Sequence, residues 1–187
     1  MAVGAVADMV GVVLCGGASR RMGQDKALVP WAGVPMARRV ADTLAAAGCR
    51  PVVAVGGNGA RLAAVGLDVV ADRWPGEGPL GAVLTALEYA AGRRVVVVAC
   101  DMPVLGARTV AAVAAGLAPG VDVAVAGAAR REPLLAAWAP SASPRLTAAF
   151  ESGVRALHVA LETLSVVEVS VSSQDVRNVN APSDLPH

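Results

Sequence analysis

The sequence predicts a three-layer α/β fold built around a mostly parallel sheet. Short runs of valine and other apolar residues alternate with longer stretches rich in alanine and leucine, which is the pattern of βαβ units. The run Arg94–Ala99 contains four consecutive valines, as expected for a central strand covered on both faces. Neither a repeat nor a linker divides the 187 residues. We therefore expect one Rossmann-like domain over residues 1–187.

Four strands and three helices are predicted in the first part of the chain. The helix over Pro35–Ala47 starts with a proline, shows apolar residues at helical spacing and stops at Gly48. A second helix over Leu80–Ala91 is followed by Gly92. The remaining expected elements are strands over Val10–Leu14, Pro51–Val55, Asp68–Ala71 and Arg94–Ala99, and a helix over Ala107–Ala115.

The second part of the chain continues the alternation. We expect strands near Val121–Ala126 and Leu134–Trp138, helices over about Pro144–Ser152 and Val154–Thr163, and a last strand over about Val166–Val171. Several of the predicted strands in the first part end in a polar or glycine-rich turn. In open α/β sheets ligands bind outside the carboxyl ends of the strands, so these turns are the predicted site.

The loop after the first strand, residues 14–26, carries the strongest chemical signal. Its glycines let backbone N–H groups approach an oxyanion, and its arginines and lysine add positive charge. It does not match the P-loop, in which Lys-Ser/Thr directly follows the second glycine, nor the dinucleotide motif GxGxxG. The second strand also ends in Gly-Gly-Asn, with no acidic residue to bind a ribose. A nicotinamide enzyme is therefore disfavoured.

This loop resembles the signature of the molybdenum cofactor guanylyltransferase family of nucleotidyltransferases, Leu-x-Gly-Gly-x-Ser-x-Arg-Met-Gly-x-Asp-Lys. The matching residues are Leu14, Gly16, Gly17, Ser19, Arg21, Met22, Gly23, Asp25 and Lys26. The resemblance continues through residues 78–81, 100–103 and 178–182, so it covers nearly the whole chain. Cys15 stands where the family usually has alanine. The resemblance implies a sheet of the nucleotidyltransferase type.

The resemblance also implies roles for individual residues. Backbone amides of Leu14, Cys15, Gly16 and Gly17 would cradle the nucleotide, with Arg21 and Lys26 on the phosphates. Asp101 would bind Mg²⁺, and Arg21, Lys26 and Asp101 would form the catalytic set. Asp72 would hold the nucleoside, while Gly78, Pro79 and Leu80 would line the base pocket. Asn178 and Asn180 would bind the pterin or close the site. Asn58, after the second strand, is a further candidate for the nucleoside.

The implied reaction is transfer of GMP from GTP to the phosphate of molybdopterin or its molybdenum form, with release of pyrophosphate. No histidine lies near the predicted site and no Ser-His-Asp set is evident. A phosphate monoester needs no strong base, because its second pKa is about 6 and it is largely dianionic at pH 7. Positioning and charge neutralisation by Mg²⁺, lysine, arginine and amides would then suffice.

The composition argues against several other classes of protein. The net charge of +1 argues against a nucleic-acid binder, and residues 15–50 hold six basic against two acidic residues, which suits a small anionic ligand. The three cysteines form no disulfide or zinc pattern. No apolar run approaches the length of about 18 residues that spans a bilayer, and no secretory signal is evident. We expect a cytoplasmic protein that binds neither membrane nor nucleic acid.

Three alternatives remain open at this point. A CTP-dependent cytidylyltransferase acting on the same cofactor shares the motifs, and a sugar-phosphate or isoprenoid nucleotidyltransferase shares the loop. A non-catalytic nucleotide-binding or delivery module is the alternative from another class, although a carrier has little need for Lys26 and Asp101. Enzymes that insert molybdenum or accept the finished cofactor are further expected partners.

Overall fold

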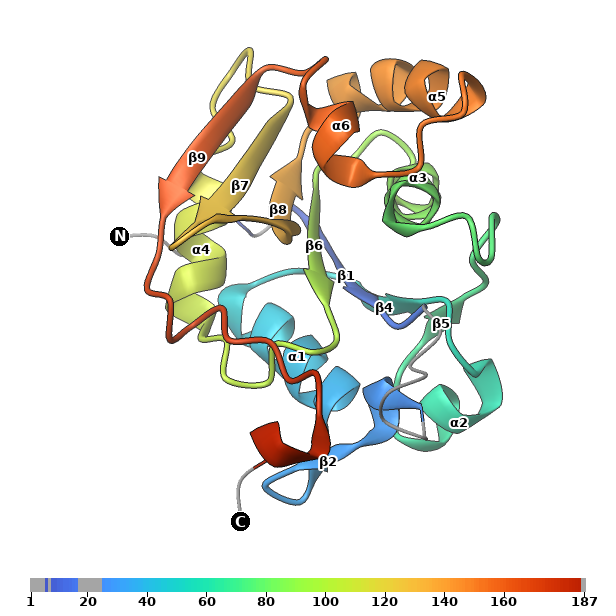
Figure 1. Ribbon diagram of the computed structural model, residues 1–187, viewed down its shortest axis with the longest axis vertical. Helices are drawn as coiled ribbons and strands as arrows, with labels where there is room; N and C mark the ends of the chain where they lie inside the picture. The colour runs from blue at the N-terminus through green and yellow to red at the C-terminus, as the bar shows by residue number, and fades with distance from the viewer. Residues whose placement is uncertain (1–5, 7, 17–24, 186–187) are drawn as a thin grey trace.

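The computed structural model describes residue 6, residues 8–16 and residues 25–185. Within these residues seven strands form a sheet in the order β5-β4-β1-β6-β8-β7-β9 (Figure 1). The strands are β1 (Val10–Leu14), β4 (Val52–Val55), β5 (Val69–Val70), β6 (Val95–Ala99), β7 (Val123–Gly127), β8 (Arg131–Trp138) and β9 (Val166–Ser170). β8 is antiparallel to both of its neighbours, and all the remaining pairs of adjacent strands are parallel. The prediction of a mostly parallel sheet is confirmed.

Helices cover both faces of this sheet. The helices α1 (Met36–Ala47), α2 (Gly59–Ala64) and α4 (Ala107–Ala115) pack on one face, and α3 (Pro79–Ala90), α5 (Ser143–Glu151) and α6 (Leu157–Leu161) pack on the other. Successive side chains of a strand point to opposite faces, so Val13 joins the first core while Val12 and Leu14 join the second. The valines of β6 divide in the same way, and all four are fully buried. The three-layer prediction is confirmed.

Several short elements escaped the sequence prediction. Lys26–Leu28 forms the 3-10 helix η2, and the hairpin of β2 (Pro30–Trp31) and β3 (Val34–Pro35) follows it. The hairpin turn has positive φ at Ala32 and Gly33, +49° and +81°, as two-residue β-turns of this kind require. Two further 3-10 turns are η3 (Pro140–Ala142) and η4 (Pro182–Asp184). Two-residue strands are too short to produce a readable alternation.

The predicted helices and strands are present, with shifts at their ends. α4 has the predicted bounds, and α1 stops at Gly48, whose φ of +111° lets its N–H bond back into the last turn. The last helix is shorter than predicted, because its N-cap Ala156 is extended, with ψ of 119°. α2 was not predicted, since the glycines before it indicate only a loop. Within the described residues, no helix is both long and apolar enough to cross a membrane.

Candidate active site

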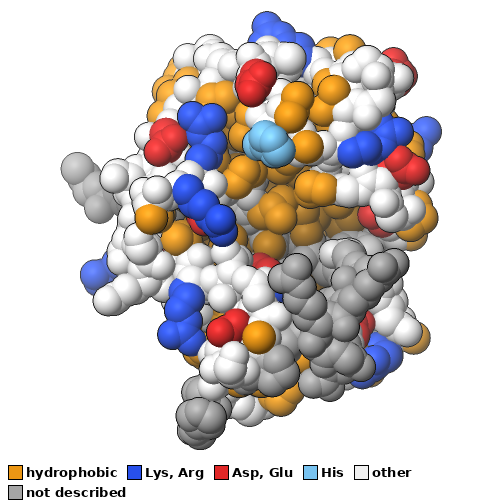
Figure 2. Space-filling view, in the orientation of Figure 1, with side chains coloured by type: hydrophobic (Ala, Val, Ile, Leu, Met, Phe, Trp, Pro, Cys, Tyr) orange, Lys and Arg blue, Asp and Glu red, His pale blue; other side chains and the backbone are white. Residues whose placement is uncertain are grey.

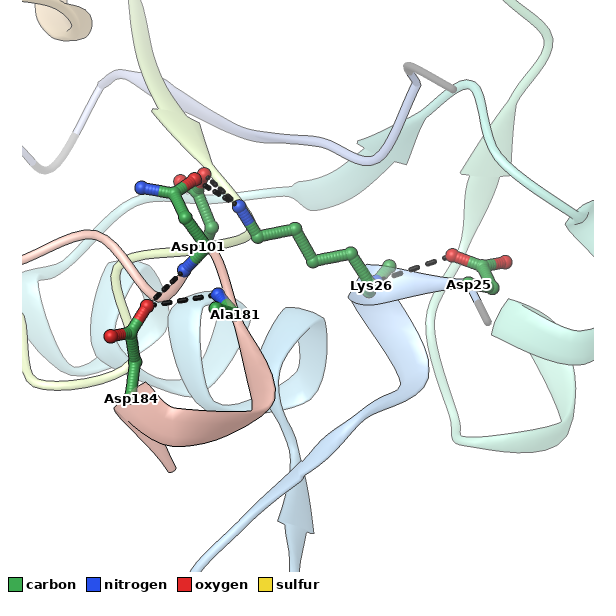
Figure 3. A network of polar contacts seen from close by, with 7 residues as sticks. Asp25, Lys26, Asp101, Ala181 and Asp184 are labelled. Carbon is green, nitrogen blue, oxygen red and sulfur yellow. Dashed lines mark hydrogen bonds and ion pairs between the residues drawn. The ribbon is translucent and has the colours of Figure 1, made fainter. Parts of the chain in front are cut away.

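The ammonium group of Lys26 and the carboxylate of Asp101 meet at the carboxyl ends of β1 and β6. Lys26 Nζ lies 2.7 Å from Asp101 Oδ2, and the two side chains are only 15% and 20% exposed (Figure 3). Asp25 caps η2 by accepting a hydrogen bond from the Ala27 N–H, which sets the start of the turn that carries Lys26. After β5 the chain crosses back over β1 to form β6. The pair therefore lies at a topological switch point, where such sheets bind ligands.

Lys26 is the only lysine in the sequence, which has 15 arginines. Arginine serves the exposed ion pairs, such as Arg38 with Asp42 at 2.7 Å. A lysine ammonium is a compact point charge, whereas a guanidinium is a wide planar fork. Position 26 alone has a compact ammonium where the other cationic side chains of the sequence, apart from histidine, are guanidinium groups. Composition therefore contained a signal for this residue that motif matching does not use.

One carboxylate oxygen of Asp101 has no hydrogen-bond partner among the described residues. Its Oδ2 accepts the hydrogen bond from Lys26, whereas its buried Oδ1 has no partner among the described residues. A buried acceptor without a partner carries a desolvation cost, which a bound cation removes. Within the described part of the chain, no three His, Cys, Asp or Glu side chains converge. A site with one carboxylate fits magnesium, which completes its shell with phosphate oxygens and water.

The start of the glycine-rich loop is packed closely against the end of β4. A Cβ added to Gly56 would lie 3.2 Å from both N and Cα of Gly16, and one added to Gly57 would lie 3.1 Å from the Cys15 carbonyl oxygen. Both residues of the β4 turn have positive φ, +75° and +74°, so glycine is required there for two reasons. The structure thus holds Gly16 where a side chain on the neighbouring turn would displace it.

The hydrogen bonds of this region correct one expectation. The Cys15 N–H donates to the Val55 carbonyl oxygen at 2.9 Å, so that amide is a sheet donor and does not cradle a phosphate. Leu14 is buried at the end of β1, and its carbonyl oxygen accepts from the Cys100 N–H. Gly16, which is exposed, is the first residue of the loop beyond these strand contacts. Gly17 and Arg21 lie outside the described residues, and their roles stay predictions.

Asp72 faces the same loop from the end of β5. A Cβ on Gly16 would lie 3.8 Å from Asp72 Oδ2. The other oxygen, Oδ1, accepts from the Trp74 N–H at 3.0 Å and lies 3.1 Å from Thr85 Oγ1. Thr85 is a buried residue of α3 and also lies 3.1 Å from the Gly81 carbonyl oxygen. Asp72 is therefore held from α3 with Oδ2 toward Gly16, and Thr85 is a site residue that sequence reasoning missed.

The predicted base-pocket segment forms the start of α3. Gly78 is the N-cap, with φ of +83°, and Pro79 takes the first helical position. Both are exposed, whereas Leu80 is buried in the core. One turn on, a Cβ added to Gly81 would lie 3.1 Å from Trp74 Cβ. The start of α3 therefore packs against Trp74, whose N–H binds Asp72. Its exposed residues, Gly78 and Pro79, come directly before the buried part of the helix.

The three predicted asparagines take different places. Asn180 joins the pair at the switch point, because its Oδ1 accepts a second hydrogen bond from Lys26 Nζ, at 2.8 Å. Asn58 caps α2, its Oδ1 accepting from the Arg61 N–H at 3.1 Å. Asn178 is half-buried two residues before Asn180. Of the three, the structure joins only Asn180 to the lysine and carboxylate by hydrogen bonds among the described residues.

The thiol of Cys100 lies next to this site in the sequence. Hydrogen bonding with the Cys15 thiol, together with burial, raises the pKa of Cys100 well above its usual value. Cys100 therefore stays a neutral thiol and adds no negative charge beside Asp101. On the face seen in Figure 2, hydrophobic side chains gather at the centre, with basic and acidic side chains and a histidine around them.

A lysine, a carboxylate and a glycine turn at the switch point of such a sheet are typical of the doubly wound α/β proteins that bind phosphorylated ligands. The chain belongs to the MobA-like NTP transferase family, whose domain matches residues 11–166, and is accordingly a nucleotidyltransferase. It is 36% identical to the molybdenum cofactor guanylyltransferase of Xanthomonas euvesicatoria, with 92% of this chain and 89% of that protein covered. The enzyme of the same name from Rhodobacter capsulatus is also 36% identical, with 95% and 93% covered.

A solved structure agrees with the sequence relatives. The molybdopterin-guanine dinucleotide biosynthesis protein A of Archaeoglobus fulgidus superposes with a TM-score of 0.75. It is 27% identical, and the match covers 94% of each chain. The resemblance inferred from the glycine-rich loop and the later motifs is thus confirmed at the level of the family and the fold.

Proposed function

We propose that this protein transfers GMP from GTP to the terminal phosphate of molybdopterin or its molybdenum form. The names of the two curated relatives support the guanylyl donor and the cofactor acceptor. The name of the solved neighbour describes the same guanine dinucleotide product. The observation that carries the proposal is the contact of Lys26 with Asp101, because a cation and a carboxylate meet at the edge of the sheet where folds of this kind bind ligands.

The chemistry required of the protein is positioning and charge neutralisation. An oxygen of the acceptor phosphate attacks the α-phosphorus of GTP, and the bond from that phosphorus to the oxygen bridging to the β-phosphorus breaks, so pyrophosphate leaves. The acceptor phosphate is already largely dianionic at pH 7 and needs no strong base. The Lys26 ammonium would neutralise charge on the phosphates, and the turn at Gly16 lets the backbone approach them. Asp72 would hold the nucleoside from the opposite side of that turn.

Mg²⁺ is the cofactor we propose, with Asp101 as its protein ligand. The unpartnered Oδ1 of Asp101 supports this assignment. When bound, magnesium would neutralise charge on the phosphate oxygens of the nucleotide. Lys26 already balances the other oxygen of the same carboxylate, so it would hold the Asp101 side chain in a single orientation.

The experiment that tests the function measures pyrophosphate release with GTP or CTP, in the presence of molybdopterin and Mg²⁺. We expect release with GTP, formation of the pterin guanine dinucleotide, and loss of both in Asp101→Asn. Asp42→Asn, which removes an exposed carboxylate paired with Arg38, is the matched control and should keep full activity. Preference for CTP would make the protein a cytidylyltransferase, and nucleotide binding without turnover would make it a carrier.

Further partners follow from the proposed reaction. An enzyme that supplies or inserts molybdenum and an enzyme that accepts the dinucleotide cofactor would work before and after this one. The cytoplasm, where GTP is abundant, is the location we propose.

A further inference from the structure

The C-terminal segment crosses the molecule to reach the site. After β9 it runs past α1 to η4, beside β2 (Figure 1). Val179 is fully buried against Val29 and Met36, and its N–H donates to the Asp101 carbonyl oxygen at 2.9 Å. The segment that begins at Val179 therefore contacts both Asp101, just after β6, and the part of the chain that follows Lys26.

Asn180 connects this segment to the lysine side chain. Lys26 Nζ donates to Asn180 Oδ1 at 2.8 Å and to Asp101 Oδ2 at 2.7 Å (Figure 3). An ammonium group has donors only, so the amide oxygen, and not the amide nitrogen, must face it. A lysine has four flexible side-chain bonds, and two oxygen partners from different segments reduce the positions that Nζ can take. Asn180 has to be held in turn, because it is an exposed residue in a loop.

Asp184 holds Asn180 in place. Its Oδ2 accepts hydrogen bonds from the backbone N–H groups of Asn180 at 2.8 Å and Ala181 at 2.9 Å. The Asp184 carbonyl oxygen also accepts from Arg177, whose guanidinium lies 5.5 Å from the Trp31 ring centre. The hydrogen bonds from Asn180 and Ala181 lower the pKa of Asp184, and the charges of Arg177 and Lys26 lower it further. The carboxylate is therefore ionised at neutral pH.

We propose that Asp184 is a positioning residue for Lys26: by fixing the turn at Asn180 and Ala181, it places the Asn180 oxygen that holds the ammonium at the nucleotide site. The effect of Asp184 on catalysis rests on the proposed function. Its effect on the position of the Lys26 side chain does not depend on any substrate. Asp184 touches neither reacting group. It acts through Asn180, so the two residues should behave as one unit when they are mutated together.

The single lysine allows a direct measurement. Growth on lysine labelled with ¹³C at Cε puts one side-chain label into the whole protein. The two hydrogens on Cε are inequivalent in an NMR spectrum when the ammonium is fixed and converge when it rotates freely. We expect two separated resonances in the wild type and near-convergence in Asp184→Ala. Unchanged separation in a folded Asp184→Ala protein would overturn the proposal, and no substrate is involved.

Asp175→Ala is the matched control. Asp175 lies in the same segment and accepts a hydrogen bond from Thr109 Oγ1 at 2.8 Å, so it anchors the segment to α4 and not to Lys26. The control should keep the separated Cε hydrogens. Equal convergence in both variants would show general loosening of the segment and would overturn a specific role. If Asp184→Ala does not fold, Asp184→Leu, which has no acceptor but a side chain of similar size, replaces it and should show the convergence. Asp184→Asn, whose remaining oxygen can accept both N–H groups, should preserve the separation, and convergence in that variant would overturn the proposal.

Kinetics provide the second readout. We expect Asp184→Ala to lower kcat about tenfold or more, as misplacement of a catalytic group does, with a smaller change in KM for GTP. Asn180→Ala with Asp184→Ala should lose no more than Asn180→Ala alone, because both act on one contact. Additive losses would overturn the coupling. If the wild type showed no transfer at all, the proposed function would fail while the NMR result still decided the placement of Lys26.

Discussion

Lys26 and Asp101 are 75 positions apart in the sequence, yet their side-chain atoms Nζ and Oδ2 are separated by 2.7 Å. The contact exists because β1 and β6 are adjacent parallel strands whose carboxyl ends open at the same edge of the sheet. A ligand that occupies this edge meets both charges at once. The arrangement makes the identity of the cation at position 26 testable.

Replacing Lys26 should remove most of the activity, whichever residue takes its place. We expect Lys26→Ala to raise the barrier by about 2–4 kcal/mol, as loss of one preorganised stabiliser does. Lys26→Arg should not restore the rate, because a planar guanidinium cannot take the place of a compact ammonium between Asp101 and Asn180. Single-turnover rates of pyrophosphate release provide the measurement. Arg38→Lys, at an exposed pair, should be harmless; a fully active Lys26→Arg enzyme would contradict the assignment.

The close approach of two glycines predicts a specific cost at Gly56. Gly56→Ala would put a Cβ 3.2 Å from the backbone of Gly16 and would strain a residue with φ of +75°. Gly92→Ala is the control, since Gly92 has φ of +85° and no atom within 4 Å of the added Cβ. The control should lose stability only through the strain of a positive φ in a residue with a Cβ, on the order of 1–2 kcal/mol. Gly56→Ala should lose more in denaturant unfolding and should also raise KM for GTP.

That comparison separates backbone strain from the contact itself. If Gly56→Ala and Gly92→Ala lost the same stability and both bound GTP normally, the turn after β4 would have no part in shaping the loop at Gly16. A KM effect confined to Gly56→Ala would instead place the nucleotide against that loop.

Thr85 should act on nucleotide binding through Asp72. Thr85→Val keeps the shape of the side chain but removes the hydroxyl that lies 3.1 Å from Asp72 Oδ1. We expect a higher KM for GTP with little change in kcat, because Asp72 loses its fixed orientation toward Gly16. Thr85→Ser, which retains the hydroxyl, should bind GTP like the wild type. Calorimetric titration with GTP and Mg²⁺ measures the affinity, and equal affinities for the two variants would remove Thr85 from the site.

Asp122 should make the folded state sensitive to acid. Burial opposes its ionisation, but hydrogen bonds from the Ser141 hydroxyl and the Ser165 N–H, with the Arg145 guanidinium, outweigh burial and hold its pKa below the usual 3.8. A pKa lowered by folding contributes stability above the unfolded value and loses it as pH falls toward the folded value. The free energy of unfolding should therefore decline below about pH 4.

The matching variant is Asp122→Asn, which cannot titrate. It should be less stable than the wild type at pH 7, since the Arg145 partner is lost, and its stability should change less between pH 5 and pH 3. Urea unfolding at each pH measures both quantities. Parallel pH profiles for the two proteins would show that another carboxylate dominates the acid response.

The sequence predicted the architecture because its signals are local. Four valines in a row indicate a central strand covered on both faces, and Gly48 indicates a helix end; both predictions are confirmed, in β6 and α1. The family resemblance implied that Lys26 and Asp101 belong to one site, and the structure brings their side chains into contact. The amide of Cys15 was wrongly assigned to phosphate, because the sequence does not show that the hydrogen-bond ladder extends one residue past β1 to Val55.

What the sequence by itself determined was which chemical groups are present and in what local setting: the glycine-rich turn, the solitary lysine, the carboxylates at strand ends and the alternation of strands and helices. Only the tertiary structure decided which of those groups contact one another. The Thr85 hydroxyl lies against Asp72, and Asn180 accepts a hydrogen bond from Lys26, across separations of 13 and 154 residues. Such contacts depend on the packing of whole elements against one another, and no local pattern in a chain specifies which distant side chain will complete a hydrogen bond.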